Sequence, residues 1–220
     1  MGGGASRQDV MEQRLSGVIF IGDNSSSSMT SDLSGSILSS SAYYNSILMR
    51  LSATSQRIIA SDTGILVLSA LFVVALHTAT NGAYGFHRDE LAVIDDARFL
   101  AWGYVAYPPV TPFIARVSLT LFGASIIGLR LFAALAVGVA MVLTGLMARE
   151  LGGKRPAQLV AAWGAATAGP VVSFGYLFQY VSFDYLWWVL AAWVTIRLLR
   201  SEDQRWWVAL GAVTGLGMMT

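Results

Sequence analysis

The sequence contains no cysteine and only two histidines among its 220 residues. The lack of cysteine excludes disulfide bonds, thiolate-bound zinc and a cysteine nucleophile. The histidines, His77 and His87, are too few for a histidine-rich metal site. Charged residues make up only 12%, about half of the usual share in soluble domains. The net charge of +1 gives no basic field for nucleic acid.

Long apolar runs take the place of the missing charge, and 55% of the residues are hydrophobic. Most runs approach the ~20 residues that a helix needs to cross a bilayer. They lack the alternation of a membrane barrel strand. We therefore predict an all-α, polytopic transmembrane helical bundle of about five spans. The runs cover about residues 64–83, 129–147, 157–174, 181–199 and from 206 onward.

Residues 1–60 differ from the rest, because they are rich in serine and show no sustained periodicity. Such composition predicts a disordered tail, here on the cytoplasmic side, ahead of a membrane domain over 61–220. One hypothesis is that the native protein starts at Met49. Because the sequence ends within the fifth apolar run, we expect an N-terminal part of a longer protein. We find no internal repeat.

Basic residues cluster in alternate connections, which indicates the orientation. If the N-terminus is cytoplasmic, all three clusters lie on the cytoplasmic side, as the positive-inside rule requires. Residues 84–128 then lie outside the cytoplasm. The clusters consist of Arg50 and Arg57; of Arg149, Lys154 and Arg155; and of Arg197, Arg200 and Arg205.

The outer segment has two helical patterns that predict helices lying on the membrane surface. The first covers Glu90 to Trp102, with Asp89 in the N-cap position and Gly103 just after the end. The second covers about residues 112–127. An alternative in which residues 110–126 form a span ranks lower, because it would reverse every later loop and spoil the charge agreement.

Asp89-Glu90 is the first candidate for chemistry. A carboxylate at a water–membrane boundary can take a proton from an acceptor hydroxyl, and His87 and Arg88 beside it suit an anion. The alternative is that Asp89 only caps the helix and Glu90 favours its first turn. Both interpretations are open on sequence alone.

Asp184 is the second candidate, because an acid inside an apolar run is costly and usually functional. The alternative is that it lies shallow enough to be hydrated. In this topology Asp184 and Asp89 lie on the same side of the membrane. Convergence of the two acids on one outer cleft would indicate a site.

Further candidates surround these acids. Tyr104 and Tyr107 can stack on sugar rings or belong to an aromatic belt. Arg116 and Arg130 can fork to a lipid phosphate or extend to headgroups. A divalent cation at Glu90, Asp95 and Asp96 is a weak alternative, since adjacent residues point apart on a helix.

The sequence resembles bacterial GT-C glycosyltransferases, and most closely the protein-O-mannosyltransferase-like group that includes lipid A aminoarabinose transferases. The resemblance covers about residues 62–220, and the Asp-Glu pair is its most specific mark. It rests on the stretches HRDEL, AWGYVAYPPVTPFIARVSLTLFG, GLRLFAALAVGVAMVLTGLMARELGG and FQYVSFDYLWWVLA.

The resemblance implies an integral enzyme of the plasma (inner) membrane. Such an enzyme moves a sugar from a polyprenyl-phosphate donor to a lipid, polysaccharide or protein acceptor outside the cytoplasm, with inversion. Asp89 would be the general base, Glu90 its partner and Asp184 an acid near the site. The other candidates, His87, Arg88, Tyr104, Tyr107, Arg116 and Arg130, would contact substrate. Membrane lipids are the remaining partners. Since substrate pockets of this family draw on later helices, the resemblance also implies that the chain is inactive alone. No cofactor is certain.

The rival class is a transporter whose outer acids bind a cation or substrate. Against it, the sequence shows neither an inverted repeat nor a pair of Gly/Pro-broken helices.

Overall fold

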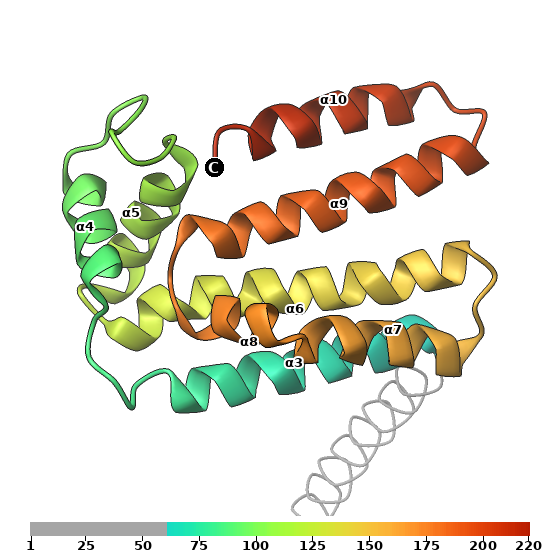
Figure 1. The fold of residues 1–220 in the computed structure, drawn as a ribbon, viewed down its shortest axis with the longest axis horizontal. Helices are drawn as coiled ribbons and strands as arrows, with labels where there is room; N and C mark the ends of the chain where they lie inside the picture. Colours follow the sequence, from blue (N-terminus) through green and yellow to red (C-terminus); the bar gives the residue numbers. More distant parts are fainter. Residues whose placement is uncertain (1–60) are drawn as a thin grey trace, which may run out of the picture. The chain divides into compact units, whose positions relative to one another are not determined.

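The computed structural model describes residues 61–220, which form eight helices and no strand (Figure 1). The all-α prediction is confirmed for this part of the chain. The predicted tail over residues 1–60 and the alternative start at Met49 lie outside the described residues. The helices are α3 (Asp62–Thr80), α4 (Arg88–Arg98), α5 (Val110–Phe122), α6 (Ile126–Glu150), α7 (Arg155–Thr167), α8 (Gly169–Tyr176), α9 (Tyr180–Arg200) and α10 (Arg205–Gly217).

Helix α6 is the centre of the bundle and packs against α3, α5, α7, α8 and α9. Its buried face consists largely of small residues, which lets neighbouring helices approach closely. At Gly138, a Cβ would lie 2.7 Å from the Val74 side chain of α3, and at Gly145, 2.6 Å from that of Leu66. A side chain at either position would therefore force the Val74 or Leu66 side chain to shift.

The connection between α5 and α6 is short because its residues satisfy both helix ends. Gly123 ends α5 with a φ of 63°, a conformation that favours glycine. Two residues later, the Ser125 hydroxyl accepts a hydrogen bond from the Gly128 N–H at 3.2 Å and caps α6. This turn fixes the start of α6, where Arg130 lies.

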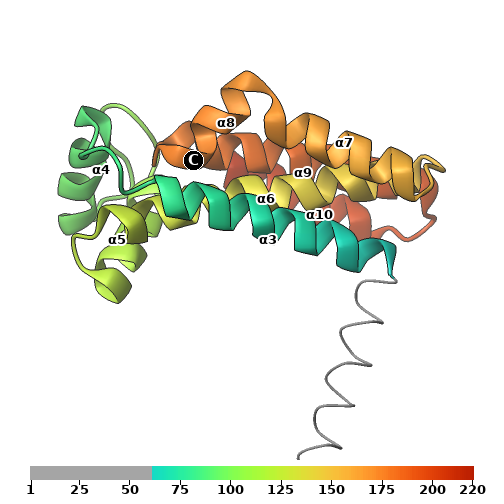
Figure 2. The same cartoon turned by 90° about the horizontal axis from the view of Figure 1, so that it is seen from below.

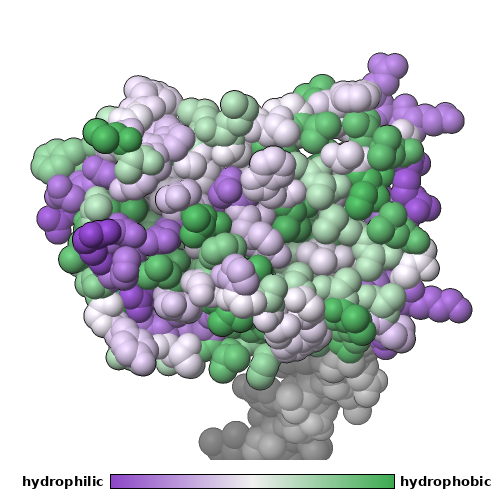
Figure 3. Space-filling model, viewed as in Figure 1, coloured by the Kyte–Doolittle hydropathy of each residue, from purple (hydrophilic) through white to green (hydrophobic). Residues whose placement is uncertain are grey.

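The two ends of the bundle carry different groups. Helices α4 and α5 lie at one end, and the α6–α7 and α9–α10 connections lie at the other, with the start of α3 (Figures 1 and 2). Hydrophilic residues gather at both ends of the face seen in Figure 3, with apolar surface between them. This arrangement agrees with a bundle that crosses an apolar layer.

Polar contacts hold the end formed by the loops. Arg197 donates to Glu150 at 2.8 Å and lies 5.1 Å from the ring centroid of Trp206. Two further arginines bind the first turn of α3: Arg149 donates to Thr63 at 3.0 Å and Arg155 to Asp62 at 3.0 Å. The described members of two predicted cytoplasmic clusters therefore belong to the same end of the bundle.

Two helices of the described part are long and apolar enough to cross a membrane, α3 with 19 residues and α6 with 25. Helices α7 and α8 make a third if they form one span. Helix α9 has 21 residues, but Asp184, Arg197 and several aromatics reduce its apolar character. Helix α10 has 13 residues. The structure thus supports two or three of the five predicted spans.

The predicted span over residues 157–174 is broken. Helices α7 and α8 meet at Ala168 with a bend of 68°, and Gly169 and Pro170 begin α8. Proline cannot donate the backbone hydrogen bond that would continue a helix, and its ring clashes with the preceding turn. The expectation concerned a pair of broken helices, so this one broken span within residues 61–220 does not contradict it.

The outer segment forms two helices at one end of the bundle, with bounds that differ from the prediction. Helix α4 ends at Arg98 rather than Trp102. Helix α5 has 13 residues, which span about 20 Å and are too few for a hydrocarbon core of about 30 Å. The alternative that made residues 110–126 a span is therefore not supported, whereas the placement of both helices at a membrane surface stays a prediction.

Candidate active site

The N-terminus of α4 is capped by His87 rather than by Asp89. The His87 Nδ1 accepts a hydrogen bond from the Asp89 N–H at 3.3 Å, and the Glu90 carboxylate accepts one from the His87 N–H at 2.8 Å. These two bonds form a capping box. The interpretation of Asp89 as the cap was therefore wrong, and its carboxylate needs another explanation.

Glu90 and Arg130 form a buried, bidentate ion pair between α4 and α6. Arg130 Nε and Nη2 donate to the two carboxylate oxygens at 2.8 and 2.7 Å, and the side chains are 0% (Glu90) and 4% (Arg130) exposed. The other donors of Arg130 reach the carbonyl oxygens of Asn81 at 2.7 Å, Gly85 at 2.9 Å and Tyr84 at 3.4 Å. A buried pair is tolerated only when its groups are satisfied in this way.

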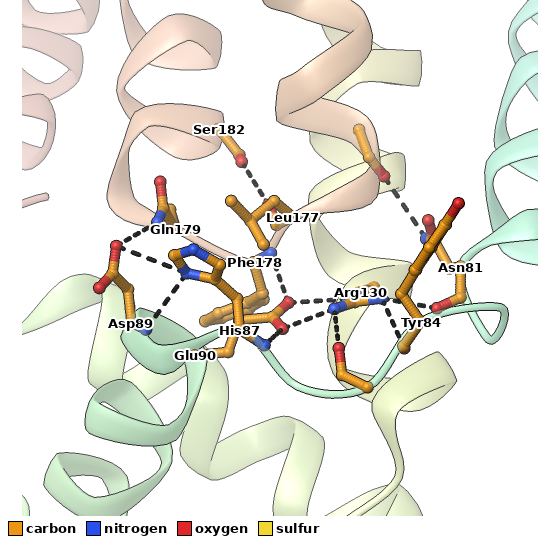
Figure 4. A network of polar contacts seen from close by, with 12 residues as sticks. Asn81, Tyr84, His87, Asp89, Glu90, Arg130, Leu177, Phe178, Gln179 and Ser182 are labelled. Carbon is orange, nitrogen blue, oxygen red and sulfur yellow. Dashed lines mark hydrogen bonds and ion pairs between the residues drawn. The ribbon is translucent and has the colours of Figure 1, made fainter.

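The same glutamate also holds the segment between α8 and α9. Its Oε1 atom accepts a hydrogen bond from the Phe178 N–H at 3.0 Å. Glu90 therefore joins the start of α4, the start of α6 and the turn before α9 (Figure 4). The sequence predicted that Glu90 is catalytic and that Arg130 binds substrate. Neither residue lines the neighbouring cavity, and the contacts of both are to other parts of the protein.

Asp89, in contrast, is half-exposed, with 43% of its side chain accessible. One carboxylate oxygen accepts a hydrogen bond from Gln179 Nε2 at 2.7 Å, and the other from Arg88 Nε at 3.3 Å. His87 Nδ1 lies 3.6 Å from the carboxylate. Because the Arg88 side chain is 92% exposed, its contact is solvated and weak. Gln179 is the short and better shielded partner.

Asp89 faces a cavity of about 810 Å³ at this end of the bundle. That volume is in the range of small-molecule sites, which combine apolar walls with a few placed polar groups. Carboxylates, tyrosines and an amide supply those groups here. The wall consists of Asp89, Ala92, Val93, Asp96, residues 103–107, Gln179 and Tyr180.

Tyrosines form one wall of this cavity. The rings of Tyr107 and Tyr180 stack with centroids 6.4 Å apart, and Tyr104 lies 6.1 Å from Tyr107. The Tyr107 hydroxyl donates to Asp96 at 2.7 Å. Burial raises the pKa of Tyr107 above its ordinary value, and the hydrogen bond to Asp96 and the charge of that residue raise it further. Tyr107 therefore stays a neutral donor at neutral pH.

Tyr104 explains why α4 ends early. Its hydroxyl lies 3.1 Å from the Asp96 carbonyl oxygen and 3.2 Å from that of Phe99, and it accepts from the Ala101 N–H at 2.8 Å. A side chain from beyond the helix thus satisfies carbonyls that a further turn would have used. The cavity-lining loop is tied back to α4 by this contact.

The remaining predicted residues lie elsewhere. Arg116 is exposed, and its guanidinium approaches the Ala97 carbonyl oxygen at 3.4 Å. Asp184 lies half-buried in the second turn of α9 and does not line the cavity. The turn before α9 does reach Asp89, but through Gln179. We predicted that Asp184 and Asp89 meet at one cleft. In the structure Gln179, five positions before Asp184, contacts Asp89 instead.

Sequence reasoning missed Gln179 and the role of Asp96 as the acceptor for Tyr107. The only signal for Gln179 is a polar residue directly before the aromatic start of α9. Within residues 61–220 no group of three or more His, Asp or Glu side chains is placed to hold a metal ion. The alternative cation site fails because Glu90 binds Arg130, Asp96 binds Tyr107 and Asp95 is exposed.

Comparison with known proteins identifies a family. Residues 106–220 match the model of the family described as dolichyl-phosphate-mannose-protein mannosyltransferase. No curated protein matches significantly, and no solved structure does. The matched residues include α5 to α10, and with them Tyr107, Arg130 and Gln179. The match covers more than half of the chain, which therefore belongs to the dolichyl-phosphate-mannose-protein mannosyltransferase family of membrane glycosyltransferases.

Proposed function

We propose that the protein transfers a sugar from a polyprenyl-phosphate donor to an acceptor hydroxyl, with Asp89 as general base. One observation carries this proposal: Asp89 is the half-exposed carboxylate at the wall of the 810 Å³ cavity, and it is not used as a helix cap. A general base must reach the proton that it removes. Asp96, the second carboxylate of the wall, already accepts from Tyr107.

The reaction is a single displacement at the anomeric carbon. The acceptor oxygen forms the new glycosidic bond, the bond from C1 to the phosphate oxygen breaks, and polyprenyl phosphate leaves with the electron pair. The acceptor proton passes to Asp89. One displacement inverts the anomeric centre. Arg88, exposed beside Asp89, is free to swing toward the phosphate, where its charge stabilises the leaving group.

The stacked rings of Tyr107 and Tyr180 suit the flat faces of a sugar, and Asp96 fixes the orientation of Tyr107. Asp184 is kept as a candidate close to this site, because an acid one turn from Tyr180 lies at the same end of α9.

The test is transfer from a defined donor. Full-length protein in detergent is incubated with polyprenyl-phosphate [¹⁴C]mannose and membrane extract as acceptor. We expect label to move from the lipid donor into product, with no transfer from GDP-mannose. Equal turnover of the nucleotide sugar, or release of label no faster than with heat-treated protein, would contradict the proposal.

We also propose that the protein is a multi-pass protein of the plasma membrane with its N-terminus in the cytoplasm. The cavity then faces away from the cytoplasm. The support is the basic residues of the α6–α7 and α9–α10 connections, which lie at the opposite end of the bundle (Figure 1). Because the chain has no cysteine, single cysteines report the side directly. We expect Trp102→Cys, in the cavity-lining loop region, to react with a membrane-impermeant maleimide in intact cells. Gln204→Cys, between α9 and α10, should react only after permeabilisation. The reverse pattern would overturn the orientation.

A further inference from the structure

Two consecutive residues of α4 meet two consecutive residues before α9. Glu90 accepts a hydrogen bond from the Phe178 N–H at 3.0 Å, and Asp89 accepts one from Gln179 Nε2 at 2.7 Å (Figure 4). One contact is buried and ends in the ion pair with Arg130. The other lies at the cavity wall, which both Asp89 and Gln179 line. The buried Glu90–Phe178 contact thus fixes the distance between α4 and the turn before α9, and the Asp89–Gln179 contact forms across the same distance.

We propose that Gln179 is a positioning residue that orients the Asp89 carboxylate for proton abstraction, an inference that rests on the proposed function. A carboxylate has two oxygens, and the amide of Gln179 holds one of them. The other, whose only contact in the described part of the chain is the long one to solvated Arg88, faces the incoming hydroxyl. Holding a catalytic group within a fraction of an ångström is worth large factors in rate.

The backbone around Gln179 is fixed, which an orienting group requires. The Gln179 carbonyl oxygen accepts from the Ser182 N–H at 3.1 Å. The Ser182 hydroxyl lies 2.8 Å from the Phe174 carbonyl oxygen and 3.1 Å from that of Leu177. Together with the Phe178–Glu90 bond, these contacts hold the residues on both sides of Gln179. The amide is also neutral, so it orients Asp89 without the strong charge pairing that makes a carboxylate a weaker base.

The experiment compares two substitutions in the full-length protein, with release of mannose from polyprenyl-phosphate mannose as the readout. Gln179→Ala removes the donor, and we expect kcat to fall about 10-fold or more with KM within about 3-fold. Gln179→Glu keeps the shape but replaces the donor by a second carboxylate. Two carboxylates in contact share a proton, so the acidic limb of the pH–rate profile should move up by about one unit or more.

The outcomes separate a positioning role from packing. A residue that only fills space would leave kcat of Gln179→Ala close to wild type. An unchanged pH profile in Gln179→Glu would show that residue 179 does not contact Asp89 in the working enzyme, and this result would overturn the inference. Unchanged kcat in Gln179→Ala would do the same. Gln204→Ala, an exposed glutamine at the other end of the bundle, is the matched control and should behave as wild type. If Asp89→Asn is fully active, Asp89 is not the general base, and the role of Gln179 fails with it. Loss of activity in Asp89→Asn together with wild-type kinetics in Gln179→Ala would overturn the role of Gln179 alone.

Discussion

Replacing Asp89 by Asn is expected to lower the rate of sugar transfer by about 10²- to 10⁴-fold, the usual contribution of a general base. An amide of the same shape cannot accept the acceptor proton at neutral pH. The fold should survive, because the cap of α4 belongs to His87 and uses the backbone N–H of residue 89. An Asn carbonyl oxygen can still accept from Gln179. The measurement is kcat for transfer from polyprenyl-phosphate mannose.

Asp95→Asn is the matched control for this experiment. It makes the same charge change on the same helix, at an exposed position outside the cavity wall. We expect its kcat to stay within about 2-fold of wild type, since surface changes away from a site have small effects. Turnover of the Asp89 variant close to wild type would show that another group accepts the proton. Loss of membrane insertion in either variant would indicate a folding defect instead.

Replacing Arg130 by Met is expected to be the most destabilising single change among the described residues, at about 3–5 kcal/mol. It leaves the Glu90 carboxylate buried and unpaired, and it removes the donor for the Asn81 and Gly85 carbonyl oxygens. Met fills much of the volume, so the loss arises from charge and hydrogen bonding rather than from a cavity. The measurement is the thermal unfolding midpoint of the purified protein in detergent.

A double-mutant cycle isolates the ion pair. Arg130→Met with Glu90→Leu should be less destabilised than the sum of the two single changes, because no lone buried charge remains. The recovery should be partial, since the Phe178 and His87 N–H groups still lose their acceptor. Arg116→Met, at an exposed arginine with a 3.4 Å contact, serves as control and should cost about 0.5 kcal/mol or less. Equal midpoints for the Arg130 and Arg116 variants would contradict a structural role for the buried pair.

Much of the helix pattern could be predicted from the sequence. The apolar runs correspond to α3, α6 and α9. Helix α3 carries apolar residues on exposed as well as buried faces, so a continuous apolar run marks it directly. The break at Gly169-Pro170 was overlooked because the run is apolar on both sides of it. Hydropathy averages over a window, whereas one proline ends a helix by removing a single donor.

The candidate site was predictable only in part. Asp89 and Glu90 stood out as charges beside an apolar run. Asp89 was a candidate for the helix cap, which His87 supplies, and Glu90 was a candidate catalytic residue, which is buried against Arg130. The N-cap rule favours Asp, but Glu90 three residues after His87 completes a capping box and moves the start of α4 two residues earlier. Nothing in the sequence near Arg130 indicates that it pairs with Glu90, which lies 40 positions away.

The sequence by itself determined that the chain is helical, that it is apolar enough for a membrane, and that an acidic pair lies in a polar segment between two apolar runs. Those properties follow from composition and period, which act over short stretches of chain. Only the tertiary structure decided which acid is free to react. Burial of Glu90 against Arg130 and Phe178, and exposure of Asp89 beside Gln179, depend on contacts between residues 40 to 90 positions apart. Pairing over such distances is set by how helices pack, and the local sequence around Asp89-Glu90 is the same whichever acid turns inward.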